Sequence, residues 1–430
     1  MKFSRPGGMT AFSIVWFGQV VSLLGSAMTW FAFTIWAWQK TGQATTLALI
    51  SAFAFLPTVL FTPVAGVLVD RWNRKLVMLF SDLASALGTL AVLILFSTNR
   101  LEIWHIYVIG ILAGFFTAFQ YPAYSAAVTT MLPKEHYARA QGMLGLAPAI
   151  SGILAPVLAA ALLGTIGMAN IMVIDLLTFL AAFATLLWVR VPQPPVSETG
   201  RASRGNFRQE LRFGFGYLRT RASLRALVIL FAFTNFFLAI GATLLAPSIL
   251  ARADGSETVL ATVQSVGAVG GVVGGALLAL WGGPKRRIHS ILLGGAGACL
   301  LGVLALGLGP GLLIWAAGSF FFSFFEPFVE GGNLAIWQAK VEADVQGRVF
   351  SARHLLVQLP YLAGMLASGP LAEYGLAPLI PPGSGPGAGL AWTLVLAAVC
   401  GAAAFLAGYA FRSIREAESL LPERNLGETK

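Results

Sequence analysis

Residues 44–69 read ATTLALISAFAFLPTVLFTPVAGVLV, a run that contains no charged side chain. A helix needs about 20 apolar residues to cross a lipid bilayer, so this run is long enough to span one. The strands of an open sheet could not satisfy their backbone polar groups in lipid, which leaves the helix as the structure for this segment.

The same pattern recurs along the whole chain, outward from this segment in both directions. Twelve such stretches lie at residues 10–37, 44–69, 76–97, 103–131, 140–164, 168–190, 223–250, 258–281, 288–308, 311–338, 349–372 and 389–411. They predict an all-α membrane protein with twelve transmembrane helices in two pseudo-symmetric six-helix bundles.

The composition excludes a water-soluble protein. The 430 residues are 57% hydrophobic and only 11% charged, whereas soluble domains have about 45–50% apolar and roughly 25% charged residues. The two cysteines, Cys299 and Cys400, both lie in apolar runs. They indicate neither a disulfide framework nor a metal cluster.

The positive charges predict the orientation in the membrane. The chain has 28 Lys and Arg, and all except Lys40, Arg100 and Arg252 fall in loops and helix ends that share one side. Because such an excess marks the cytoplasmic side, we expect a multi-pass protein of the inner membrane with both termini in the cytoplasm. The net charge of +10 is thus a topology signal and an attraction for membrane lipid, and we expect no nucleic acid partner.

A long polar gap divides the predicted spans six and six. It predicts an N-terminal bundle over 1–190, a linker over 191–222, a C-terminal bundle over 223–411 and a cytoplasmic tail over 412–430. Within the linker, Phe207, Leu211, Phe215 and Leu218 share one helical face. This pattern is typical of an amphipathic helix on the inner leaflet, and an ordinary solvated linker helix is the alternative.

The two halves resemble each other in sequence. The fourth span carries Gly114 and then Pro122, and the tenth carries Gly318 and then Pro327. Parallel six-helix repeats of this kind indicate a binding site near the bilayer midplane. The glycines of the eighth span, of which Gly271 is one, indicate close helix packing.

The loop after the second span carries the most specific motif. It reads Gly66-Val67-Leu68-Val69-Asp70-Arg71-Trp72-Asn73-Arg74-Lys75. An acid at a membrane edge can face the positive end of a neighbouring helix and pair with arginine.

With the twelve spans, this motif resembles the Gly-x-x-x-Asp-Arg-x-Gly-Arg-Lys signature of the major facilitator superfamily. The resemblance implies a conformational latch formed by Gly66, Asp70, Arg71, Arg74 and Lys75. Asp82, one to two turns into the third span, is a candidate partner for Arg74 or Arg71. The alternative is a loop that serves only the charge asymmetry. Two departures are that Asn73 replaces the usual glycine and that the second half, at Gly282 to Arg287, lacks the acid.

Four further features resemble the macrolide-efflux and siderophore-exporter branch of that family. They are Trp16-Phe17-Gly18-Gln19, Asp175-Leu176-Leu177-Thr178-Phe179, the arginine-rich central loop and Gly347-Arg348-Val349. The resemblance implies a secondary active transporter that exports hydrophobic or amphipathic small molecules, as multidrug antiporters do. A lipid or lysolipid carrier and a solute importer of the same fold are the alternatives, and a membrane enzyme or receptor is a third.

Acidic residues inside the spans are the sharpest chemical signal. Burying an ionisable group in a membrane is costly, so each one is a functional candidate. Glu326 and Glu330 lie one turn apart around Pro327, and two carboxylates at that spacing share a helix face. We expect this pair to couple transport to an ion, with H⁺ as the expected ion; an ion pair with Arg353 is the structural alternative. Asp175 is expected to bond a neighbouring helix instead.

The substrate cavity is expected to be lined by aromatic and amide side chains, which suit a large amphipathic ligand. The candidates from the spans that resemble the family's cavity-lining helices are Gln19, Phe119, Tyr121, Tyr124, Asn235, Phe324 and Phe325. The four histidines are scattered without metal-ligand spacing, and the chain shows no hydrolase or phosphate-binding motif. We therefore expect neither an enzyme nor a cofactor or metal, and transport driven by an ion gradient.

Overall fold

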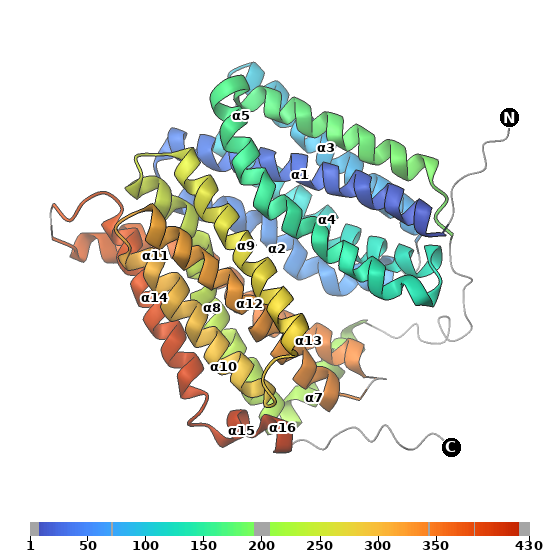
Figure 1. Ribbon diagram of the computed structural model, residues 1–430, viewed down its shortest axis with the longest axis vertical. Helices are drawn as coiled ribbons and strands as arrows, with labels where there is room; N and C mark the ends of the chain where they lie inside the picture. The colour runs from blue at the N-terminus through green and yellow to red at the C-terminus, as the bar shows by residue number, and fades with distance from the viewer. Residues whose placement is uncertain (1–7, 70–71, 193–206, 343–344, 382, 421–430) are drawn as a thin grey trace. The chain divides into compact units, whose positions relative to one another are not determined.

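The protein is described by a computed structural model that covers residues 8–69, 72–192, 207–342, 345–381 and 383–420. Regular structure in these ranges is helical, and none of it is β-strand (Figure 1). Eleven helices there are long and apolar enough to cross a membrane. The prediction of an all-α membrane protein is confirmed.

The chain divides into two compact units by its internal contacts. The first unit comprises residues 1–42, 49–203 and 255–265. Its elements are α1 (Gly8–Thr41), α2 (Ala44–Val69) apart from its first turn, α3 (Arg74–Ser97), α4 (Ile103–Met131), the 3-10 turn η1 (Lys134–His136), α5 (Tyr137–Trp188) and the first turns of α9 (Glu257–Trp281).

The second unit comprises residues 43–48, 204–254 and 266–430. Beside the remaining part of α9, its elements are α7 (Phe207–Thr220), α8 (Ala222–Arg252), α10 (Arg287–Gly297), η2 (Ala298–Val303), α11 (Leu304–Leu308), α12 (Leu312–Lys340), α13 (Gln346–Pro370), η3 (Leu371–Leu376), η4 (Ala377–Leu379), α14 (Ala388–Ala407), α15 (Arg412–Arg415) and α16 (Ala417–Leu420).

Helix α5 contains two membrane spans. Its Gly167 has φ 77° and ψ 170°, a non-helical conformation that a residue without a Cβ adopts readily. Both halves pack on α1, since Trp16 donates to the carbonyl of Met143 at 2.7 Å and Gly25 contacts Asp175. The chain therefore folds back at Gly167, and Figure 1 shows the two arms of α5. Counting the two halves of α5 separately brings the eleven apolar helices to the predicted twelve.

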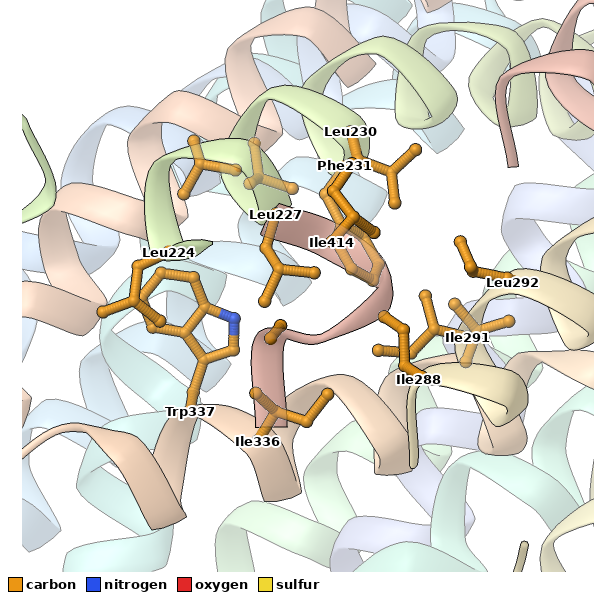
Figure 2. Packing of buried hydrophobic residues seen from close by; sticks show 14 of the residues in the cluster. Leu224, Leu227, Leu230, Phe231, Ile288, Ile291, Leu292, Ile336, Trp337 and Ile414 are labelled. Atoms are coloured by element: carbon orange, nitrogen blue, oxygen red, sulfur yellow. The ribbon is translucent and has the colours of Figure 1, made fainter. Parts of the chain in front are cut away.

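A cluster of buried apolar side chains packs several helices of the second unit together (Figure 2). Leu227 and Phe231 of α8 meet Ile291 of α10, Trp337 of α12 and Ile414 of α15 there. Lipid tails are as apolar as leucine, so contact between helices within the bilayer gains little from the hydrophobic effect. Tight packing of such side chains is consequently the main attraction between these helices.

Glycines let α9 approach α12 closely. A Cβ on Gly270 would lie 2.2 Å from the carbonyl oxygen of Phe320, and one on Gly274 would lie 2.1 Å from that of Phe324. No side chain fits at those distances, so the two backbones touch directly. The predicted packing role of the glycines in this span is confirmed.

One partly buried cation joins helix ends in the second unit. The guanidinium of Arg252, at the end of α8, donates to the carbonyls of Leu306 at 2.6 Å and Gly307 at 3.0 Å. It also lies over the ring of Trp315, whose indole N–H donates to Gly309. Carbonyls at a helix C-terminus have no partner within the helix, so Arg252 satisfies the end of α11.

Helix α7 docks on the second unit through one face. Gly214 lies against the carbonyl of Arg348 on α13, and the hydroxyl of Tyr217 donates to the carboxylate of Glu342. Leu218 is buried on the same side, whereas Phe215 is exposed. The face of α7 that packs on protein thus contains Gly214, Tyr217 and Leu218, and the predicted contact of Phe215 with the membrane stays a prediction.

The side chains of Phe207 and Leu211, also on the predicted apolar face, lie outside the described part. Burial raises the pKa of Tyr217 to about 12, and the hydrogen bond from this hydroxyl holds the pKa of Glu342 below its usual range. Glu342 is consequently ionised at neutral pH. Arg221 completes the contact, with its guanidinium 3.5 Å from the centre of the Tyr217 ring.

Substitution of Gly274 by alanine should destabilise the protein by about 1–3 kcal/mol, because the new Cβ pushes α9 away from α12. Gly271→Ala is the matched control, since its Cβ would lie 3.7 Å from the nearest atom, an ordinary contact distance. The melting temperature of the purified protein in detergent measures both. Equal melting temperatures of the two variants would contradict the close approach.

Tyr217→Phe removes the hydroxyl that holds Glu342 and should release α7 from α13. Hydrogen–deuterium exchange of the amides in 214–220 is expected to become several-fold faster than in the wild type. Tyr409→Phe is the control, because the hydroxyl of Tyr409 contacts His289 elsewhere in the unit. Unchanged exchange in Tyr217→Phe would show that packing alone holds α7.

Candidate functional site

The basic residues of the loop between α2 and α3 bind helix carbonyls within the first unit. Lys75 donates to the carbonyls of Leu187 and Val189, at 3.0 and 2.7 Å, where α5 ends. Arg74 donates to the carbonyl of Ala126 on α4 at 2.9 Å. A cation at a helix C-terminus is favourable because it faces the negative end of the helix dipole.

The other predicted latch residues are only partly described. Asn73 is the N-cap of α3, with its side-chain oxygen accepting from the amide of Leu76 at 3.3 Å. Asp70 and Arg71 lie outside the described residues, and Gly66 falls within α2 without described surroundings. The latch therefore stays a prediction.

Asp82 is the centre of a buried polar cluster on α1, α3 and α4. One carboxylate oxygen accepts from the carboxamide of Gln19 at 3.0 Å, and the other accepts from that of Gln120 at 2.5 Å. The side chain of Asp82 is only 3% exposed. The sequence predicted Arg74 or Arg71 as its partner, and the structure gives it two carboxamides.

Asp175 forms a second buried cluster in the same unit. Its carboxylate accepts from the hydroxyl of Ser26 on α1 at 2.9 Å and from that of Thr89 on α3 at 3.1 Å. The prediction that Asp175 bonds neighbouring helices is confirmed. Hydroxyl donors satisfy this buried acid, which ties three membrane spans to one another.

Glu326 and Glu330 remain exposed on α12 in the second unit. The charge of Glu330 acts on Arg353 of α13, and the charge of Glu326 acts on Tyr361 of the same helix. Arg353 lies over the ring of Trp337, 5.0 Å from its centre. Among the described residues it forms no ion pair with either glutamate, so the pair has not been neutralised by direct contact.

A ladder of phenylalanine rings adjoins these acids on α12. Phe320 and Phe324 stack at 5.9 Å between ring centres, and Phe321 and Phe325 stack at 6.4 Å. Phe324 also meets Phe328 at 5.5 Å. The ladder offers a continuous aromatic surface one to two turns from Glu326, and a cation can bind over such ring faces.

The remaining cavity candidates differ in their surroundings. Phe119 is buried beneath Trp72, whose ring stacks on it at 5.9 Å, so Phe119 serves packing in this structure. Tyr121 is exposed, and Tyr124 and Asn235 are partly buried. The hydroxyl of Tyr124 is buried and has no hydrogen-bond partner among the described residues.

Sequence reasoning missed Gln120 as a member of the site. It stands as an amide between Phe119 and Tyr121 in an otherwise apolar stretch of α4, and that isolated polarity was the available signal. Within the described residues, no group of three or more His, Cys, Asp or Glu side chains could hold a metal ion. The groups that remain available for chemistry are membrane-embedded acids, amides and aromatic rings.

Known structures share this fold. A bacterial homologue of the human lysosomal transporter Spinster, in an inward-facing and unoccupied conformation, matches with a TM-score of 0.68 and 15% identity over 95% of this chain and 98% of that one. A bacterial homologue of the iron transporter ferroportin, in an inward-facing state, matches with a TM-score of 0.66 and 15% identity over 93% and 98%.

Relatives in sequence include efflux proteins. Macrolide efflux protein A of Streptococcus pyogenes is 30% identical over 368 residues, which cover 84% of this chain and 89% of that protein. The multidrug efflux pump Tap of Mycolicibacterium fortuitum is 32% identical over 121 residues, 28% of this chain and 29% of that pump. The predicted resemblance to the macrolide-efflux branch agrees with these relatives.

A family model covers most of the chain. The Major Facilitator Superfamily model matches residues 15–365, a range that contains both the loop motif and the acids of α12. The twelve apolar spans, the motif and this match agree with one another. The chain therefore belongs to the Major Facilitator Superfamily, and it is a multi-pass membrane transporter rather than an enzyme.

Proposed function

We propose that this transporter exports hydrophobic or amphipathic small molecules, macrolides among them, by alternating access driven by an H⁺ gradient. The observation that carries the proposal is the exposed pair Glu326 and Glu330 beside the phenylalanine ladder of α12. Acids that serve only structure are expected to be buried and hydrogen-bonded, as Asp175 is. An exposed acid pair within a span is available for a proton or for a cationic ligand.

The phenylalanine ladder and the two glutamates of α12 together suit a substrate with a hydrophobic body and a polar or cationic group. Stacked aromatic side chains offer large contact areas to a hydrophobic body, and a few polar groups orient the ligand. The relatives named for macrolide and multidrug efflux support export over import. The charge asymmetry supports an inner-membrane protein with both termini in the cytoplasm.

Expression in an efflux-deficient bacterial host tests the proposal. The gene should raise the minimal inhibitory concentration of macrolides several-fold, and dissipating the proton gradient should restore accumulation of the drug in the cells. An unchanged drug sensitivity with verified membrane expression would contradict the proposed export.

Glu326→Gln keeps the size and hydrogen bonding of the side chain but removes its titratable proton. If Glu326 couples export to H⁺, gradient-driven uptake of a macrolide into inverted vesicles falls to background while downhill exchange persists. Glu330→Gln, one turn away, is expected to be milder. Transport is normalised to folded protein, and full gradient-driven uptake by Glu326→Gln would remove this residue from the coupling mechanism.

Asp70→Asn tests the proposed latch. The change removes the negative charge that the family signature places at this membrane edge, and transport should drop several-fold without loss of membrane insertion. Asn73→Gly is the control, because it restores the residue usual in the signature and should leave transport unchanged. Normal transport by inserted Asp70→Asn protein would show that the loop serves only orientation.

A further inference from the structure

The buried carboxyl group of Asp82 has carboxamides as its polar partners. Gln19 reaches it from α1 and Gln120 from α4, and each turns its N–H group towards one carboxylate oxygen. Gln120 also lies 3.4 Å from the oxygen of Gln19. Asp82 is 3% exposed, while both glutamines are only partly buried, so the amides are more accessible than the acid that they bind.

The side-chain hydrogen-bond partners of Asp82 within the described part of the chain are the two carboxamides of α1 and α4. On α3 itself, Arg74 is directed to the carbonyl of Ala126. From α5, which also packs on α3, Asp175 binds Thr89. On α4, the hydroxyl of Tyr124 is buried one turn beyond Gln120 and has no hydrogen-bond partner in the described part of the chain.

The protonation state of Asp82 determines whether the glutamine side chains direct an oxygen or an N–H group away from the carboxyl group. An ionised carboxylate only accepts hydrogen bonds, so both glutamines must turn their N–H groups inward, as observed. The oxygen of Gln19 then accepts from Gln120, and the oxygen of Gln120 has no partner among the described residues. In this state the cluster offers an acceptor oxygen backed by a negative charge.

A protonated Asp82 would reverse the arrangement. A protonated carboxyl carries one O–H donor, which needs an amide oxygen as its acceptor. The carboxamide that supplies this oxygen must rotate by half a turn and direct its N–H group outward. The same cluster then offers a donor without charge, which repels an ammonium group.

We propose that Asp82, Gln19 and Gln120 form a proton-controlled binding site for the ammonium group of an amphipathic amine. The ammonium donates to the oxygen of Gln120 and is attracted by the charge of Asp82. When a proton binds Asp82, the amide turns and the ammonium is released, so the site holds either the proton or the cation. This inference rests on the proposed export function and assigns to it a substrate class and an exchange site in the first unit.

Asp175 provides a matched control within the same unit. It is equally buried, at 4% exposure, and also contacts α1 and α3. Its partners are hydroxyl groups, which can donate or accept by rotation without turning an amide. Asp175→Asn therefore removes a buried acid while it leaves the exchange chemistry in place.

Infrared difference spectra between low and high pH test the switch without any ligand. The wild-type spectrum should contain a protonated-carboxyl band together with a change in the side-chain amide bands. Asp82→Asn should remove one component of the carboxyl band and the amide change with it, Gln120→Met should keep that carboxyl component and lose most of the amide change, and Asp175→Asn should keep both the Asp82 component and the amide change. A wild-type spectrum in which Asp82→Asn removes no carboxyl band, or no amide change with it, would overturn the proposal.

Calorimetric binding of erythromycin, a macrolide with a dimethylamino group, tests the exchange. Titrations in two buffers of different ionisation enthalpy near the titration midpoint of the infrared band should show that wild type and Asp175→Asn release a proton on binding. Asp82→Asn should release none, and Gln120→Met should bind about tenfold more weakly, as expected for a lost hydrogen bond to a charged group.

Failure of the exchange site and failure of the proposed export function give different results. Erythromycin binding with equal proton release by wild type and Asp82→Asn would overturn the exchange site and leave export standing. A wild type that shows the infrared switch but binds neither erythromycin nor other lipophilic amines would overturn the assigned substrate class and weaken the export function. Melting temperatures of every variant show that a changed signal does not come from unfolding.

Discussion

Hydrocarbon offers no hydrogen bonds, so every polar group that enters the membrane must find its partner within the chain. The backbone meets this constraint by forming helices, and the side chains meet it at the helix ends and crossings. Lys75 and Arg252 donate to terminal carbonyls, and Asp82 and Asp175 accept from amides and hydroxyls. These ionisable groups thus join helices that would otherwise attract one another only through packing.

Glu326 and Glu330 depart from this pattern, and the departure makes them informative. They are exposed on α12, and the phenylalanine rings of the same helix lie beside them. Asp82 and Asp175 each accept hydrogen bonds from neighbouring side chains. Neither glutamate forms an ion pair with Arg353 among the described residues. The contrast with Asp175 separates acids that bind helices together from acids that are available to protons and ligands.

The sequence predicted the spans well because hydrophobic length is a local property, and even the break at Gly167 falls between two predicted spans. It predicted the role of Asp175 because an acid away from the cavity-lining spans needs a neighbour. It could not predict the partners of Lys75 and Arg252, since these are backbone carbonyls and every residue has one. The partner of Asp82 was also missed, because it depends on how three helices are rotated about their axes.

Arg252 has a consequence for how the protein is made. Its acceptor Leu306 lies 54 residues further along the chain, so Arg252 is synthesised well before the carbonyls that satisfy it. At a translation rate of about 5–20 residues per second, this interval lasts roughly 3–10 s. Until then the end of α8 carries a guanidinium group without these acceptors, which favours holding it in water or at the insertion machinery. The C-terminal end of α8 is therefore completed by a helix that has not yet been synthesised when α8 enters the membrane, which gives the assembly of the second unit an order.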